Sequence, residues 1–160
     1  MKTNVLLILK PDCLRRGIAE VVLDRYLAAG FTVDAVGYRT VDRDLILAHY
    51  AESIARIGPE LETRVLNSYV GRSMVPVVLG YEGSEGIAKA RALTGATYPS
   101  KAATGTIRGD LSSDTVSAAI AGNRVCDNLV HCSDSEESFQ RELALWFRPE
   151  TRRRFPPSHA

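Results

Sequence analysis

Hydrophobic and polar positions along the chain follow periods that predict both strands and helices. Val5–Leu9 is an unbroken apolar run, which is typical of a strand buried on both faces. Pro11 is expected to end this strand, because proline cannot donate to a sheet ladder. Three further runs predict strands at Phe31–Arg39, Met74–Tyr81 and Val125–His131. The pattern therefore predicts four strands.

Apolar residues at helical spacing separate these strands. The predicted helices are Gly17–Ala29, Asp42 to about Ser53, Glu60–Tyr69, Ser84–Thr94 and a last helix that opens at Ser133 or Asp134. Ser133 and Glu136 have the spacing of a capping box, which supports the start of the last helix. A loop rich in Gly, Thr and Ser is expected over Gly95–Asp110.

Leu111–Arg124 predicts an added helix near residues 112–122. Ser113 or Asp114 would cap its start, and Gly122 with Asn123 would end it. Its apolar residues would pack against the rest of the domain.

Without the additional helices, the order of elements is β-α-β followed by β-α-β. This order predicts an α+β protein with the split βαβ, ferredoxin-like fold, in which a four-stranded antiparallel sheet has helices on one side. The 160 residues suit one domain, expected over residues 1–150, and an Arg/Pro-rich tail over residues 151–160. The three consecutive arginines at 152–154 are expected to be solvated.

Composition excludes several functional classes. The chain has 20 Lys and Arg against 19 Asp and Glu, so it lacks the basic excess of a nucleic-acid-binding domain. No apolar stretch approaches the roughly 18 residues needed to cross a membrane. Cys13, Cys126 and Cys132 are odd in number and never spaced CxxC, so neither a disulfide framework nor a structural zinc site is expected. A cytoplasmic location follows as the simplest expectation.

His131 is the histidine with the most informative context. It ends the last predicted strand and precedes a helix N-terminus, where an anion is favoured. A histidine hydrogen-bonded beneath a loop fits that context equally well. His49 is expected at the surface or half-buried on its helix, and His159 in a disordered tail.

Three cations can surround a polyphosphate near His131. Arg108 lies between Gly105 and Gly109, so the backbone can approach a ligand while the guanidinium binds it. Lys10 and Arg91 can join it, although each cation alone would also suit a solvated surface. Together they suggest phosphoryl transfer through a phosphohistidine, without a Walker loop or a GxGxxG motif.

Several motifs occur in one order along residues 3–150. They are Lys10-Pro11-Asp12, His49-Tyr50, Thr97 with Pro99, Gly105–Asp110, and Asn128-Leu129-Val130-His131-Cys132-Ser133-Asp134-Ser135, followed by Glu137-Ser138 and Glu142. In content and order they resemble the nucleoside diphosphate kinase family. That resemblance implies the same ferredoxin-like fold.

The resemblance also implies a ping-pong reaction. His131 would take the γ-phosphoryl group of a nucleoside triphosphate and pass it to a nucleoside diphosphate. Glu142 would orient the imidazole with support from Ser133. Arg91, Thr97 and Arg108 would bind the phosphates, and Tyr50 would line the phosphate site. Lys10 and Asn128 would contact the ribose, and Lys10 would also belong to the catalytic residues. Val125 would form a wall of the base site.

Cofactor and partners follow from the same resemblance. Mg²⁺ would be carried by the β- and γ-phosphates, and Glu52 would contact it through water. The partners would be nucleoside tri- and diphosphates. The chain would assemble as a homo-oligomer, either a hexamer or a tetramer, with no membrane or nucleic-acid partner.

The departures from the family lie mostly on the base side of the site. Residues 56–62 contain no aromatic side chain where the family has a phenylalanine platform, although Ile57 or Leu61 offers an apolar face. The segment 111–124 is added. Glycines are replaced by Cys126 and Cys132, and an asparagine by Tyr98, so we expect retained phosphate chemistry with altered base recognition or subunit packing.

Two alternatives remain open at this level. One is a pathway-specific kinase that uses the same chemistry on a modified nucleotide. The other is a nucleotide-binding regulatory protein without turnover. The thiol of Cys132 is either a harmless small side chain or a redox-sensitive group beside the nucleophile.

Overall fold

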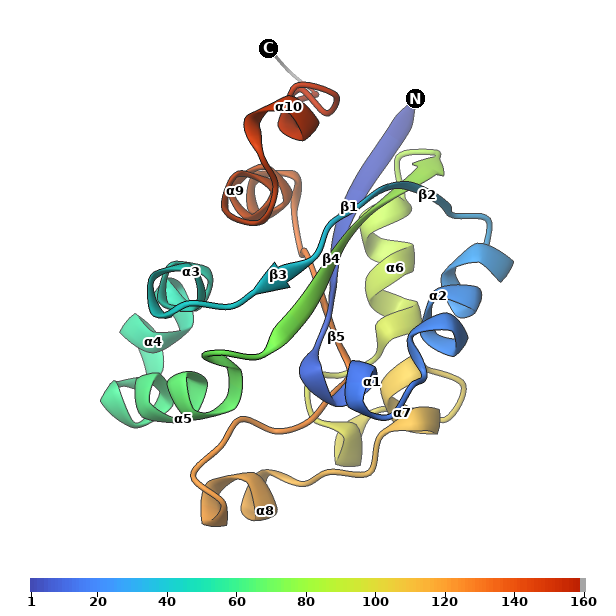
Figure 1. Ribbon diagram of the computed structural model, residues 1–160. Coiled ribbons are helices and arrows are strands. Elements are labelled where there is room, and N and C mark those ends of the chain that lie inside the picture. Colours follow the sequence, from blue (N-terminus) through green and yellow to red (C-terminus); the bar gives the residue numbers. More distant parts are fainter. Residues whose placement is uncertain (159–160) are drawn as a thin grey trace.

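The computed structural model describes residues 1–158 and centres on an antiparallel sheet (Figure 1). The strand order is β2 (Thr32–Val36), β4 (Ser73–Glu82), β1 (Lys2–Leu9) and β5 (Val130–Cys132), with β3 (Arg39–Thr40) paired to β4. Every pairing is antiparallel. The α+β, ferredoxin-like prediction is therefore confirmed, with five strands in place of four.

The extra strand arises because the predicted run Phe31–Arg39 breaks into β2 and β3. Val36 pairs with Val77, and Arg39 pairs with Met74. Between these pairs the amide of Gly37 donates to the carbonyl of Pro76 at 2.8 Å. Pro76 has no N–H to return, so the ladder is interrupted at this point.

Helices account for most of the remaining chain. Their bounds are α1 Pro11–Arg15, α2 Ala19–Ala28, α3 Arg43–His49, α4 Ala51–Ile57, α5 Pro59–Tyr69, α6 Gly86–Thr94, α7 Ile107–Leu111, α8 Val116–Ala121, α9 Glu136–Trp146 and α10 Pro149–Arg152, with the 3-10 helix η1 at Pro99–Lys101. Within residues 1–158, no helix has the length and apolar character to cross a membrane.

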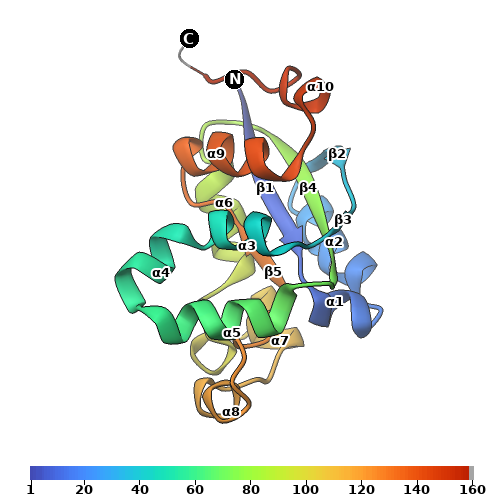
Figure 2. The same ribbon diagram turned by 60° about the vertical axis from the view of Figure 1, so that its left-hand side comes forward.

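Helices cover both faces of the sheet, whereas the sequence pattern predicted them on one side. The crossover helices α2 and α6 lie on one face, and α3, α5 and α9 lie on the other (Figures 1 and 2). Successive strand side chains point to opposite faces. Because Val5–Leu9 is buried throughout, both faces of β1 need cover.

Two helix starts differ from the predictions. Pro11 begins α1 at a position where its missing N–H costs nothing, so it both ends β1 and opens a helix. The last helix is capped by a box between Ser135 and Ser138, and not by Ser133 with Glu136. The Ser133 hydroxyl instead accepts the Leu6 amide of β1 at 3.0 Å.

The added helix is shorter than predicted. It is α8, and Thr115 caps it by accepting the Ala118 amide at 3.2 Å. Ser113 is exposed, and Asp114 pairs with Arg124 instead of capping. Gly122 ends the helix as expected, and Asn123 follows in the left-handed region at φ 48°.

The C-terminal segment folds back onto the domain. Phe155 is buried against Phe139 of α9, and Arg154 donates to the Asp34 carbonyl of β2 at 2.7 Å. The arginine side chains at 152–154 are exposed. His159 lies outside the described residues.

Replacing Ser133 by alanine should destabilise the fold. The change leaves the buried Leu6 amide without an acceptor, which costs about 1–3 kcal/mol of unfolding free energy. Urea denaturation measures the effect, and Ser113→Ala at an exposed position is the matched control. Equal stability of the two variants would contradict the assigned hydrogen bond.

Candidate active site

A cleft of about 490 Å³ opens beside the ends of β1 and β5. It gathers most of the residues that the sequence motifs single out. These are Lys10, Tyr50, Glu52, Arg91, Thr97, Arg108, Asn128, His131 and Glu142. Two of the predicted site residues, Val125 and Ser133, do not line this cleft.

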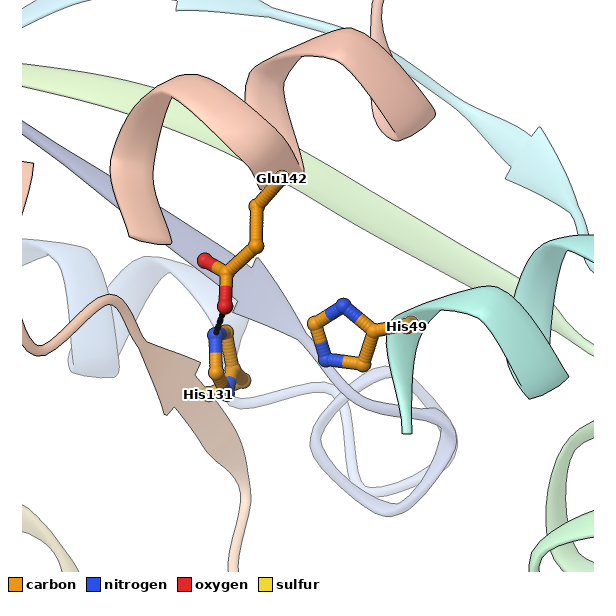
Figure 3. A group of neighbouring side chains, drawn as sticks. All are labelled: His49, His131 and Glu142. Atoms are coloured by element: carbon orange, nitrogen blue, oxygen red, sulfur yellow. Dashed lines mark hydrogen bonds and ion pairs between the residues drawn. The ribbon is translucent and has the colours of Figure 1, made fainter. Parts of the chain in front are cut away.

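His131 and Glu142 form the central contact of the cleft. Nε2 of His131 lies 2.9 Å from Oε1 of Glu142, which reaches it from α9 (Figure 3). Burial, assisted by the charges of Lys10 and Arg108, lowers the pKa of His131 to about 3. The imidazole is therefore neutral, and donation from Nε2–H to Glu142 leaves the lone pair on Nδ1.

The Glu142 carboxyl is itself almost enclosed. Its side chain is 4% exposed, and burial raises its pKa to about 7. Its second oxygen, Oε2, has no hydrogen-bond partner within residues 1–158. Within these residues, the hydrogen bond of the carboxyl group is the one to His131.

His49 is a buried member of this cluster, and the expectation of a surface or half-buried position is wrong. Nδ1 of His49 accepts from Nε1–H of Trp146 at 3.1 Å, so its own proton is on Nε2. That edge of the ring packs against the face of His131, with centroids 4.6 Å apart and planes at 82° (Figure 3). Burial and the neighbouring His131 hold the pKa of His49 well below its usual value. The signal in the sequence was its position four residues after the buried Leu45 of the same helix.

The three side chains His49, His131 and Glu142 are close enough to share a metal ion. Two of the nitrogen atoms that could bind a metal already have hydrogen-bond partners, however. Nδ1 of His49 accepts from Trp146, and Nε2 of His131 bonds to Glu142. We interpret the group as a hydrogen-bonded device that fixes the orientation of His131.

A second chain of contacts joins the first strand to the loop before β5. The buried Nζ of Lys10 donates to Oδ1 of Asn128 at 2.8 Å, and Nδ2 of Asn128 donates to the Thr97 carbonyl at 2.8 Å. The carboxylate of Asp12 accepts the amide of Leu129 at 3.0 Å. Leu129 has φ 72°, so Asp12 holds a strained turn two residues before His131. Sequence reasoning assigned Asp12 only to a motif and missed this function.

Arg108 is buried and binds the backbone around His131. Its guanidinium donates to the carbonyls of Asn128, Gly95 and Val130. Gly109 beside it is required, because a Cβ there would lie 2.1 Å from the Ala103 carbonyl oxygen. Arg108 also lines the cleft.

Two cleft arginines were not identified from the sequence. Arg141 of α9 lies with Nη2 4.0 Å from Glu142 and Nε 3.9 Å from Glu52. Arg56 of α4 lines the opposite rim. With Lys10, Arg91 and Arg108, five cationic side chains line the cleft against the three carboxyl groups of Glu52, Asp134 and Glu142, and this excess of positive charge suits a polyphosphate.

Comparisons with known proteins agree with this geometry. The family model described as nucleoside diphosphate kinase matches residues 3–152. A protein of Nocardioides sp. with that name is 42% identical over 147 residues, which are 92% of this chain and 98% of the relative. One of Rhodococcus jostii is 40% identical over 148 residues, which are 92% of this chain and 96% of the relative. The chain belongs to the nucleoside diphosphate kinase family. It is accordingly a phosphotransferase.

Solved structures of the family superpose closely on this chain. A nucleoside-diphosphate kinase of Borrelia burgdorferi, described as a transition-state mimic with bound vanadate and ADP, has a TM-score of 0.85 at 29% identity and covers 93% of this chain and 89% of its own. An NDP kinase of Pyrobaculum aerophilum has a TM-score of 0.81 at 29% identity and covers 94% of this chain and 98% of its own. These matches support the fold independently of the sequence motifs.

Two residues that follow His131 in this nucleoside diphosphate kinase family member, Cys132 and Ser133, are buried. The fully buried Ser133 serves β1 through Leu6, and no hydrogen bond within residues 1–158 joins it to Glu142. Burial raises the pKa of Cys132 to about 12, so its thiol stays protonated. A buried, protonated thiol is inert, which favours the harmless alternative for Cys132.

The low pKa of His131 predicts an unusual titration. Between about pH 5 and pH 8 the folded protein should keep His131 neutral, with Nδ1 unprotonated and Nε2 protonated, because burial opposes the imidazolium. Two-dimensional ¹⁵N NMR of the histidine rings measures this directly. The urea-unfolded chain is the control, where all three histidines should titrate near the ordinary pKa of about 6.5. A folded-state midpoint near that value would refute the assignment.

Proposed function

We propose that the protein transfers the γ-phosphoryl group of a nucleoside triphosphate to a nucleoside diphosphate through a phosphohistidine at Nδ1 of His131. The observation that carries the proposal is the neutral imidazole bonded through Nε2 to Glu142 in a positive cleft. Nδ1 attacks the γ-phosphorus, the bond to the β-phosphate oxygen breaks, and the diphosphate leaves. A second diphosphate then attacks the phosphohistidine and restores the imidazole.

The proposed binding residues divide by the part of the nucleotide that they contact. Lys10 and Asn128 would hold the ribose hydroxyls, supported by their mutual hydrogen bond. Arg91, Thr97 and Arg108 would bind the phosphates beside Tyr50, and Val125 would form a wall of the base site. Ser133 would act indirectly, by fixing the β1–β5 pairing under His131.

The donors around the cleft fit a magnesium ion that arrives on the substrate. Mg²⁺ is usually held by substrate phosphates, water and one or two carboxylates. The Glu52 side chain is 81% exposed at the cleft, so its carboxylate can reach a metal-bound water. The bound ion would neutralise charge on the β- and γ-phosphates.

The two alternatives have less support. A regulatory protein without turnover would not need the buried Glu142 that fixes the nucleophile. Relatives that share about two fifths of the sequence carry the ordinary family name, which does not favour a modified nucleotide. We also propose a cytoplasmic location, because Cys13, Cys126 and Cys132 are free and buried, as in a reducing compartment.

Intact-protein mass spectrometry after mixing with Mg-ATP tests the phosphohistidine. The wild type should gain one phosphoryl group that is acid-labile and base-stable, and His131→Ala should gain none. His159→Ala is the matched control, because it removes another histidine and should still accept one group. An adduct that persists in His131→Ala, or none in the wild type, would overturn the proposal.

We further propose a homo-oligomer, a tetramer or hexamer built from dimers. The strand β2 ends the sheet, and its neighbourhood exposes large apolar side chains, with Val33 40%, Val36 61% and Tyr38 67% exposed. An unpaired strand edge with apolar side chains favours pairing with another copy.

The Val36→Lys substitution should weaken that assembly by placing a charge on the edge. Size-exclusion chromatography with light scattering should give a smaller multiple of 17.5 kDa than the wild type. Val70→Lys, at a residue 43% exposed after α5, is the control. A monomeric wild type, or no change in Val36→Lys, would rule out this interface.

A further inference from the structure

A second pocket of about 270 Å³ adjoins the phosphate cleft. Lys10, Tyr50, Thr97 and Asn128 line both spaces, so the two are continuous. A nucleotide whose ribose lies at Lys10 and Asn128 would direct its base into this second pocket. The base is therefore the occupant that the continuity favours.

The pocket lies between two helical walls. The α4–α5 hairpin supplies Ile57 and Leu61, and the added helix α8 supplies Val116, Ala119 and Ile120. Both views of the molecule have α8 below α5 (Figures 1 and 2). Ile57 is 51% exposed and Ile120 is 56% exposed, so both retain apolar surface that a ligand can cover.

An ion pair connects the two ends of the added segment and so restrains the position of α8. Asp114 before the helix and Arg124 after it form a two-point contact, with Nη2 3.0 Å from Oδ1. Asp114 also accepts the amide of Asp127 at 2.7 Å. These bonds from Arg124 lower the pKa of Asp114, so it stays ionised.

Two further hydrogen bonds tie the segment that follows α8 to α5. Nδ2 of Asn67 in α5 donates to the carbonyl of Asn123 at 3.0 Å. The amide of Val125 donates to Oγ of Ser68, also in α5, at 2.8 Å. The spacing between the two walls is therefore set before a ligand arrives.

We propose that α8 extends the wall of the base site that Val125 begins, so that Val116 and Ile120 pack on a nucleobase whose other face contacts Ile57 and Leu61. This inference rests on the proposed function and extends it to specificity. Aliphatic faces on both sides bind a base by the apolar area that it buries. Purines bury more area than pyrimidines, so purine nucleotides should be the better substrates.

Steady-state kinetics with GDP, ADP, CDP and UDP as acceptors tests the specificity. The double substitution Val116→Ala with Ile120→Ala should raise KM for the purine acceptors about tenfold and leave kcat nearly unchanged. Val70→Ala, outside the pocket, is the matched control. Equal kcat/KM for purines and pyrimidines in the wild type, or an unchanged KM in the double variant, would overturn the inference.

Methyl NMR gives a readout that does not depend on turnover. The Ile120 δ1-methyl signal, assigned with Ile120→Val, should shift upfield through the ring current of bound GDP. Inorganic tripolyphosphate, which fills the cleft without a base, should leave it in place. A methyl signal that shifts with protein concentration and not with GDP would mean that α8 contacts another copy of the chain, and would overturn the inference.

The two proposals fail in different ways. If the wild type forms no acid-labile adduct, the proposed phosphohistidine mechanism is wrong. An adduct that forms normally, together with an Ile120 methyl that ignores GDP, would remove only the function assigned to α8.

Discussion

The hydrogen bond between His131 and Glu142 is the interaction on which the functional site depends. An imidazole can attack phosphorus only while it is neutral and only through the nitrogen that carries the lone pair. Burial and the surrounding cations keep His131 neutral, and Glu142 takes the proton-bearing Nε2. The cations that line the cleft therefore also oppose protonation of His131.

Several neighbouring side chains fix the position of the His131 imidazole. Trp146 fixes the tautomer of His49, which packs on the face of His131. Asp12 secures the turn at Leu129, and Ser133 completes the pairing of β5 with β1. β5 has only three residues, so these side-chain contacts replace the long ladder that a longer strand would supply.

The sequence predicted those features that depend on local periodicity or on a recognised motif. The apolar run of β1 is buried in the structure, and the predicted last helix is present as α9, which buries Phe139, Leu143 and Trp146. The burial of His49 could not be predicted in the same way, because its partners Trp146 and His131 are distant in sequence. The cap of α9 was misplaced for a related reason: Ser133 has a competing partner in β1, which no local pattern reveals.

The fold can accommodate the added segment 111–124 because hydrogen bonds connect the parts of the chain on either side of it. Arg108, before the segment, bonds to the carbonyls of Asn128 and Val130 after it. Ser112 closes the same gap by donating to the Asp127 carbonyl at 2.8 Å. A loop whose ends are fixed by the parent structure can lengthen at a small entropic cost and without moving its anchors. The surroundings of His131 and the pocket wall at α8 are thus structurally separable, so the wall can change while His131 and its supports stay in place.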